Sequence, residues 1–375
     1  KQEALGIFLG SSSTEEQSLR EKAMDLADLG WQPLFGEALE ELLETEPALI
    51  PGRVARLDGK HYYVYAESGV LRTELAHWLR ESALARAELP AVGDWVAVRD
   101  DGAKATIHAV LPRRGHFSRK VAGNATEEQV VASNVDTVFL VTGLDNDFKV
   151  RRIERYLTLA ANSGAVPVVV LSKADLCDDR TRDERVEAVR GVALDGVDVL
   201  AVSAHSDDGV DALRAYVGPG RTVAFLGSSG VGKSTLTNAL LGEERMATGG
   251  VRDHDSHGRH TTTARELLLV PGGGVLIDTP GMRELQLWAD EASLQTAFTD
   301  IDALAAHCHF RDCTHVSEPG CAVREALEDG TLDEGRYQNY LKLRKELARL
   351  ARRQQQAATK MQQKSNRGGG NRKKR

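Results

Sequence analysis

Short stretches in which apolar and polar residues alternate mark the chain between residues 47 and 112. Gly and Asp separate the stretches, and alternation with a period of two is typical of strands that have one buried face. About five short strands over about 65 residues suit a small closed barrel such as an OB-fold, although another small β-domain has the same pattern. The clearest stretches are Arg53–Leu57, Tyr62–Tyr65, Asp94–Arg99 and Ala105–Leu111.

Beyond residue 120 the pattern changes to apolar strands that alternate with amphipathic helices. This alternation predicts an α/β domain with a mostly parallel sheet over residues 113–287. The expected strands are Val135–Thr142, Val166–Leu171, Val197–Val202, Thr222–Leu226, Leu267–Val270 and Val275–Ile277. The expected helices are Arg151–Ser163, 182–190, Val210–Val217 and Lys233–Leu241.

The two ends of the chain differ from this centre. Residues 1–46 are acidic and weakly patterned, with one helix expected at Glu37–Glu46, and residues 288–375 have helical patterning. We therefore expect a multi-domain protein. Its parts are an N-terminal extension (1–46), an OB-fold β-barrel (47–112), an α/β domain (113–287) and a C-terminal α-helical domain (288–375).

Composition excludes several classes of protein. Hydrophobic residues make up 41% and charged residues 27% of the 375 positions, which is a globular composition. The longest apolar stretches, such as Val166–Leu171, fall far short of the roughly 20 residues that a membrane span needs. The N-terminus has no secretory apolar region, so we expect a cytoplasmic protein without a membrane partner.

The net charge of −7 conceals a strong asymmetry. Residues 336–375 hold 14 Lys and Arg and one Glu, a local charge of +13, whereas the other 335 residues hold 34 basic and 54 acidic side chains. The body thus carries −20. Such a basic tail is either a solvated end or an arm that binds phosphate backbone.

A phosphate-binding motif lies in the α/β domain. Gly227-Ser-Ser-Gly-Val-Gly-Lys-Ser-Thr235 fits G-x-x-x-x-G-K-[ST], between an expected strand and an expected helix. In such a loop backbone N–H groups point at phosphate oxygens, the lysine reaches the β- and γ-phosphates, and the next hydroxyl binds Mg²⁺. The expected nucleotide-binding residues are Gly227, Ser228, Ser229, Gly230, Val231, Gly232, Lys233, Ser234 and Thr235, with Ser234 also on Mg²⁺.

Two further segments are expected to close over the phosphates. Asp278-Thr-Pro-Gly281 follows a strand, where the Asp can hold Mg²⁺ through water and the Gly N–H can reach the γ-phosphate. Upstream, a long polar loop ends in Gly258-Arg-His-Thr-Thr-Thr263 and suits a switch, although a plain surface loop is the alternative. Thr262 or Thr263 is the favoured Mg²⁺ ligand.

The base is expected to be guanine. Ser172-Lys-Ala-Asp175 resembles the N/T-K-x-D element of GTPases, and an Asp carboxylate accepts from the N1–H and exocyclic amine that adenine lacks as a pair. Ser203-Ala204 resembles the second base-contacting loop. The contacting residues are Ser172, Lys173, Ala174, Asp175, Ser203 and Ala204. Ser172 departs from the usual Asn, and its shorter hydroxyl is expected to lower nucleotide affinity.

The order of the motifs is their most specific property. Ordinary GTPases begin with the phosphate loop and end with the base-reading elements, but here Ser172–Asp175 and Ser203–Ala204 come first. This is a circular permutation, and it joins Asp278-Thr-Pro-Gly281 directly to the C-terminal region, so nucleotide state and that region are expected to be coupled. Met282 stands where many GTPases have a water-orienting Gln, so we expect slow intrinsic hydrolysis, with His260 as a candidate water-positioning residue.

A cysteine cluster follows the α/β domain. Cys308, Cys313, His315 and Cys321 have the spacing C-x4-C-x-H-x5-C, and three of the four Cys of the chain fall in this segment. In a cytosolic protein such spacing indicates one structural Zn²⁺ more often than a disulfide. His307 and His309 are rival ligands, and reduced thiols without metal are the alternative.

Together these motifs resemble the ribosome small-subunit-dependent GTPase family (RsgA, also called YjeQ) over about residues 50–350. Three further segments carry the same resemblance, namely Gly93-Asp-Trp-Val96, Asn134-Val-Asp136 and Glu318-Pro-Gly-Cys321. The resemblance implies an OB-fold, a permuted GTPase domain and a zinc-binding helical domain. It also implies a role in late maturation of the bacterial 30S subunit, with GTP hydrolysis to GDP stimulated by that subunit. The catalytic histidine proposed for the family carries over to His260, and Lys233 is the second expected catalytic residue.

The expected partners are the 30S subunit and its 16S rRNA, bound by a monomer. Tyr62, Tyr63 and Tyr65 could stack on RNA bases, although alternation places some of them in the core. The basic connector Arg113–Lys120 and the tail could contact phosphate. A nucleotide-gated RNA-binding module with little hydrolysis is the second hypothesis. A small-molecule kinase is the third, and the guanine element weakens it.

Overall fold

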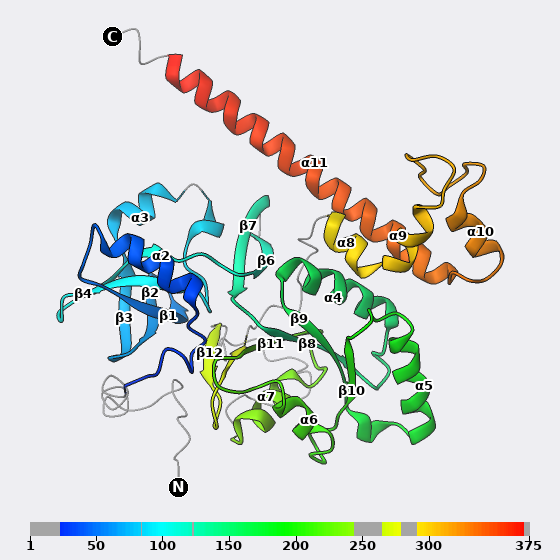
Figure 1. Ribbon diagram of the computed structural model, residues 1–375, viewed down its shortest axis with the longest axis horizontal. Helices are drawn as coiled ribbons and strands as arrows, with labels where there is room; N and C mark the ends of the chain where they lie inside the picture. The colour runs from blue at the N-terminus through cyan, green and yellow to red at the C-terminus, as the bar shows by residue number, and fades with distance from the viewer. Residues whose placement is uncertain (1–22, 84, 122–123, 244–264, 279–290, 371–375) are drawn as a thin grey trace, which may run out of the picture.

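The computed structural model describes residues 23–83, 85–121, 124–243, 265–278 and 291–370. Figure 1 shows two lobes side by side, one holding the N-terminal strands and the other the α/β domain, with a long C-terminal helix that projects beyond both. Apart from a two-stranded hairpin, the named strands form one continuous sheet of 11 strands in the order β10-β9-β8-β11-β13-β12-β1-β2-β3-β5-β4.

The N-terminal lobe is a closed five-stranded barrel, as the sequence predicted. Each strand pairs with the next in the order β1-β2-β3-β5-β4 and back to β1, with only β3 and β5 parallel. Its interior holds apolar side chains that face inward on alternate positions, among them Val54, Val64, Val96 and Ile107. The strands are β1 (Leu49–Asp58), β2 (His61–Ala66), β3 (Gly69–Leu75), β4 (Trp95–Asp100) and β5 (Ala105–Val110), with α3 (His77–Ser82) and a 3₁₀ turn η1 (Arg86–Glu88) between β3 and β4.

The segment before the barrel packs onto it. Its helix α2 (Pro33–Leu43) begins before the expected range, because proline suits the first turn of a helix. Phe35 is fully buried, and Trp31 meets Trp95 of the barrel edge to face with ring centroids 4.7 Å apart. The N-terminal lobe therefore includes the described part of this segment.

The α/β lobe has the predicted elements within a few residues. A parallel block, β10-β9-β8-β11-β13, ends in the antiparallel β12. Helices α6 and α7 cover one face of the sheet, and α4 and α5 cover the other. The strands are β8 (Thr137–Gly143), β9 (Val166–Ser172), β10 (Asp198–Ala201), β11 (Thr222–Gly227), β12 (Glu266–Leu269) and β13 (Val275–Asp278). The helices are α4 (Val150–Ser163), η2 (Ala174–Leu176), α5 (Asp179–Arg190), α6 (Val210–Arg214) and α7 (Lys233–Leu241).

An antiparallel hairpin, β6 (His116–Val121) with β7 (Asn124–Ser133), occupies the expected connector between the lobes. Arg53 of β1 is buried beside its base and donates to the carbonyls of Leu29, Gly93 and Asn134. Gly93 has a φ of +91°, and an added Cβ would lie 2.3 Å from the Ser133 carbonyl oxygen, so only glycine fits. Asn134 has a left-handed backbone, with a φ of 54°, and its side-chain amide donates to the Gly93 carbonyl at 3.1 Å, so an asparagine suits the other side of this junction.

The described part of the C-terminal region, residues 291–370, contains four helices and so has the expected helical character. They are α8 (Glu291–Ala297), α9 (Thr299–Ala305), α10 (Ala322–Glu328) and the 37-residue α11 (Glu334–Gly370). Helix α11 packs against α8, β7 and α4, and its C-terminal end projects beyond the two lobes (Figure 1). Among the described residues, no helix combines the length and apolar character that a membrane crossing requires.

Candidate functional site

The phosphate loop lies where β11 ends and α7 begins. Gly232 takes a φ of +94° at the N-cap, which turns the chain so that the backbone N–H groups of α7 face the loop. The ammonium of Lys233 donates to the carbonyl oxygens of Gly227, at 2.7 Å, and Ser228. Ser234 is half-buried beside it and Thr235 is exposed. Lys233 can therefore exchange its hydrogen bonds to the loop carbonyls for hydrogen bonds to phosphate oxygens.

Ser172 ties the base-reading segment to this loop. Its hydroxyl is buried and lies 2.6 Å from the carbonyl oxygen of Val231 and 3.3 Å from that of Thr142. The side chain therefore holds the phosphate loop and leaves base contact to its neighbours. The sequence interpretation weighed only how far the hydroxyl could reach and missed this contact.

Hydrogen bonds hold the other residues of the two expected base-reading loops in place. The Ser203 hydroxyl lies 2.5 Å from Asp175 Oδ1, which joins the two expected base loops. Lys173 has a left-handed backbone, with a φ of 60°, and its ammonium lies 2.6 Å from Asp145 Oδ2. Ala174 is buried and Ala204 half-buried next to them. One carboxylate oxygen of Asp175 thus has a partner inside the protein.

Asp145 is a site residue that the sequence reasoning did not identify. Burial alone raises the pKa of Asp145, but hydrogen bonds from Lys173 and from the Asp147 backbone, with the lysine charge, lower it overall. The carboxylate therefore stays ionised and holds the ammonium of Lys173 at this edge of the sheet. The sequence did contain a signal for this role. Asp145 follows the end of β8, and the carboxyl ends of the parallel strands β8 and β9 lie at the same edge of the sheet.

Asp278 ends β13 at the same edge of the sheet. The register of β11 with β13 pairs Ala224 with Ile277, which brings Asp278 beside the strand that leads into the phosphate loop. Ligands of open parallel sheets bind at these carboxyl ends. The expected residues His260, Thr262, Thr263, Gly281 and Met282 lie outside the described residues.

The cysteine cluster forms one compact group. The three Sγ atoms and one imidazole nitrogen of Cys308, Cys313, His315 and Cys321 all lie within 4.8 Å of one another. His315 Nδ1 lies 3.5 Å from the sulfurs of Cys308 and Cys321, and Cys313, His315 and Cys321 are buried. Burial raises the pKa of the Cys313 thiol to about 11 and lowers that of His315, which favours a neutral imidazole. Three sulfurs and one nitrogen in this space match a tetrahedral zinc site.

A carboxylate and a tyrosine hold the loop around these four residues. Glu318 accepts hydrogen bonds from the Thr314 hydroxyl and from the backbone N–H groups of Thr314, Val316 and Ser317. The bond from the Thr314 hydroxyl, followed by those from the backbone of Ser317 and Thr314, lowers the pKa of Glu318. Tyr337 of α11 donates to the carbonyl oxygen of His315 at 2.5 Å. The cluster is therefore fixed both by its own loop and by the last helix.

The residues expected to face RNA are only partly available. Tyr62 and Tyr65 are buried, so the proposal that they stack on bases is wrong for both, and Tyr63 packs under Arg56. Arg113 is also unavailable, because it makes a two-pronged ion pair with the fully buried Asp94. In the described part of the barrel, the prominent exposed aromatic side chain is Trp78 of α3, which is 51% exposed.

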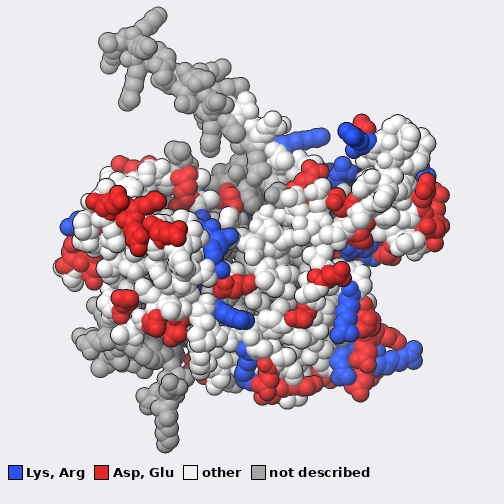
Figure 2. All heavy atoms as spheres, viewed as in Figure 1, with Lys and Arg blue, Asp and Glu red and all other residues white. Residues whose placement is uncertain are grey.

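Charge is unevenly distributed over the surface. Figure 2 shows acidic side chains gathered on the barrel lobe and basic ones in the seam between the lobes and around the near part of α11. On α11, exposed basic residues recur at helical spacing and so share one side. They are Lys342, Lys345, Arg349, Arg352 and Arg353.

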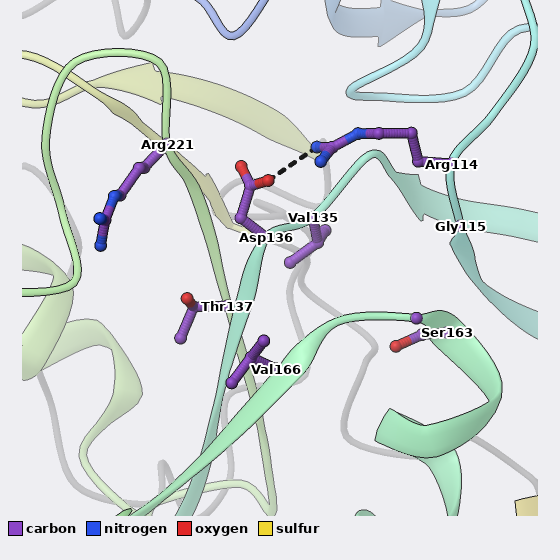
Figure 3. Close-up of a pocket in the computed structure, with 9 residues that line it drawn as sticks. Arg114, Gly115, Val135, Asp136, Thr137, Ser163, Val166 and Arg221 are labelled. Carbon is purple, nitrogen blue, oxygen red and sulfur yellow. Dashed lines mark hydrogen bonds and ion pairs between the residues drawn. The ribbon is translucent and has the colours of Figure 1, made fainter. Parts of the chain in front are cut away.

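A separate pocket of about 350 Å³ lies at the opposite edge of the sheet, where β8 and β9 begin. Figure 3 shows Arg114 and Arg221 on its rim, with Arg114 paired to Asp136. Asp136 also accepts from the backbone N–H of Thr222 at 2.7 Å. These bonds brace the junction of the lobes, and the pocket is distinct from the phosphate loop.

Comparison with known proteins matches this geometry. The family model for the RsgA GTPase matches residues 110–288, and the small ribosomal subunit biogenesis GTPase RsgA of Opitutus terrae is 51% identical over 344 residues, covering 88% of this chain and 92% of that protein. The chain belongs to the RsgA GTPase family. The RsgA of Xanthomonas axonopodis pv. citri is 45% identical over 332 residues, covering 87% of this chain and 89% of that protein.

Solved structures agree with this RsgA assignment. YjeQ from Thermotoga maritima aligns with a TM-score of 0.61 at 28% identity, covering 80% of this chain and 99% of that one. YloQ, described as a circularly permuted GTPase, aligns with a TM-score of 0.58 at 26% identity, covering 80% and 95%. A model named for 50S ribosome-binding GTPases matches residues 222–356, a shorter part of the chain that begins at β11.

Proposed function

We propose that this protein hydrolyses GTP during biogenesis of the small ribosomal subunit, and that binding to the 30S subunit stimulates the reaction. The observation that carries the proposal is the bond from Ser172 to Val231, which joins a guanine-reading segment to a phosphate loop at one sheet edge. The relatives named for small-subunit biogenesis, 51% and 45% identical, supply the cellular process.

Separate elements of the site bind the base, the phosphates and the Mg²⁺ of the nucleotide. Asp175 accepts from the guanine edge, and Lys173, fixed by Asp145, lies along the base. Lys233 transfers its hydrogen bonds from the loop carbonyls to the β- and γ-phosphate oxygens. Ser234 and Asp278 would hold Mg²⁺, which supplies charge neutralisation at the phosphates. His260 orients the attacking water in place of the Gln that Met282 replaces.

The cysteine cluster would hold one Zn²⁺ in a structural role. Its three sulfurs and one nitrogen would fill all four positions of a tetrahedral site, which is typical of structural zinc. Because Tyr337 binds the carbonyl of His315, an ordered cluster also fixes the start of α11.

The 16S rRNA would be bound by the basic side of α11 and by Trp78 of the barrel. The basic side of α11 would place a row of positive charges against the phosphate backbone. Its residues are Lys342, Lys345, Arg349, Arg352 and Arg353. Trp78 offers an open ring face on which an unpaired base can stack. The protein acts as a monomer in the cytoplasm in this proposal.

The deciding experiment measures GTP hydrolysis by the full chain with and without purified 30S particles. Stimulation that disappears in Lys233→Ala is the expected result, and 50S particles serve as the control. Equal rates with and without 30S particles, together with tight GTP-dependent binding to them, would favour the nucleotide-gated binding module instead. Preference for ATP over GTP would refute the guanine assignment.

A further inference from the structure

Helix α4 contacts the phosphate loop through one tyrosine. The hydroxyl of Tyr156 lies 3.2 Å from the Ser228 hydroxyl, and the Tyr156 side chain is almost fully buried. The carbonyl oxygen of the same Ser228 accepts from the ammonium of Lys233. Ser228 therefore lies between α4 and the lysine that must reach the phosphates.

The two residues before Tyr156 bind α11 on the other side of the helix. Glu154 is fully buried and accepts from Arg336 at 2.9 Å and from Asn339 at 2.6 Å. Arg155 makes a two-pronged ion pair with Glu346, with both N···O distances 2.8 Å. Three consecutive residues of α4 thus bind two different parts of the molecule.

Arg336 extends this connection into α9. Its guanidinium also makes two bonds of 2.7 Å to Asp300 and lies over the ring of Phe298, 4.7 Å from the centroid. Buried charges with this many partners have one favoured arrangement, so α11 is held on α4 in a single position. A short helix transmits a displacement of one side to the other because its backbone is rigid.

We propose that Tyr156 is a positioning residue for the phosphate loop, and that the docking of α11 on α4 sets the position of Ser228 through it. A partner that moves α11 then alters nucleotide retention without touching the nucleotide. The inference rests on the proposed nucleotide site, but it does not require that the partner be a ribosomal subunit.

The expected effects follow from the bonds involved. Tyr156→Phe removes one hydroxyl and no ring contact, and loss of one hydrogen bond corresponds to a change of about 2- to 12-fold in an equilibrium constant. We expect GDP to dissociate faster by this factor. Glu346→Gln breaks the partly exposed pair with Arg155 and is expected to accelerate dissociation by about 2-fold, in line with a modest ion pair.

The test measures the dissociation of a fluorescent GDP analogue from the full chain, chased with unlabelled GDP. Two matched controls remove the same chemical groups elsewhere. Tyr216→Phe removes a hydroxyl bound to Asp198, and Glu184→Gln removes the carboxylate of an exposed pair with Arg180. Both controls should leave the dissociation rate unchanged, and thermal melting should confirm that all four single variants fold.

The double variant decides the mechanism. If Tyr156 carries the connection, Glu346→Gln has no further effect once Tyr156→Phe is present. An unchanged dissociation rate in Tyr156→Phe would overturn the proposal, as would an equal effect of Glu346→Gln in both backgrounds. Failure of the unaltered protein to bind GDP would instead refute the nucleotide site and the inference with it.

Discussion

Replacement of Ser172 by alanine tests the contact between the base-reading segment and the phosphate loop. The change removes one oxygen that is buried and bonded to two carbonyls, at 2.6 Å from Val231 and 3.3 Å from Thr142. A single hydroxyl proton serves both acceptors, so only one strong bond is lost. The side chain is small, and its loss leaves no large cavity.

The magnitude follows from that one bond. A net hydrogen bond contributes about 1 kcal/mol, and a buried carbonyl left without a partner costs about 1–3 kcal/mol. Val231 is buried, so we expect a loss in the upper part of this range if water cannot reach its carbonyl. Because each 1.4 kcal/mol is roughly a factor of ten, a loss of about 2–3 kcal/mol should lower GDP affinity about 30- to 150-fold.

The assay is a titration with a fluorescent GDP analogue, followed by thermal melting with and without GDP. Ser118→Ala is the matched control, since Ser118 is also a buried serine but its hydroxyl has no hydrogen-bond partner among the described residues. That variant should bind GDP normally and melt at the same temperature or higher. Equal GDP affinity in Ser172→Ala and the unaltered protein would refute the argument.

Three further predictions concern other parts of the molecule. Trp78→Ala should weaken binding to 30S particles about 5- to 150-fold, the range for loss of one stacked base, and leave GDP affinity unchanged. Cys313→Ser should abolish stoichiometric zinc by metal analysis and lower the melting temperature, whereas Cys177→Ser, remote from the cluster, should do neither. Burial alone raises the pKa of Asp300, but its bonds to Arg336 lower the pKa overall. The ion pair therefore stabilises the fold above pH 3.8, and this stabilisation is lost as the pH falls through the lowered pKa. Asp300→Asn should therefore lower the melting temperature at neutral pH, and its difference from the unaltered protein should shrink in acid; a constant difference would contradict this.

Much of the fold was predictable because burial leaves a period in the sequence. The strands of the sheet and helix α7, Lys233–Leu241, follow from that period and from the phosphate-loop motif. The hairpin β6–β7 could not be predicted in this way. Basic residues such as Arg113 and Arg119 made this segment resemble an exposed connector. Arg113 instead neutralises the buried Asp94.

The site was predictable where a motif fixes residues close in sequence. The cysteine cluster is compact because its four ligands fall within one short segment. Contacts between distant segments have no such signal: Glu154 lies 182 residues from Arg336, and Tyr156 lies 72 residues from Ser228. Alternation indicated that some of the tyrosines of β2 lie in the core, but not that Tyr62 and Tyr65, which are on opposite faces of the strand, are both buried.

The buried Arg53 has a consequence for the order of folding during synthesis. Its guanidinium needs the carbonyls of Leu29, Gly93 and Asn134, and desolvation lowers its pKa to about 10, so the charge is costly without those partners. Chains fold from the N-terminus as they emerge. We therefore expect the barrel lobe to reach its full stability only after residue 134, which lies just before the first strand of the nucleotide-binding lobe, has been translated.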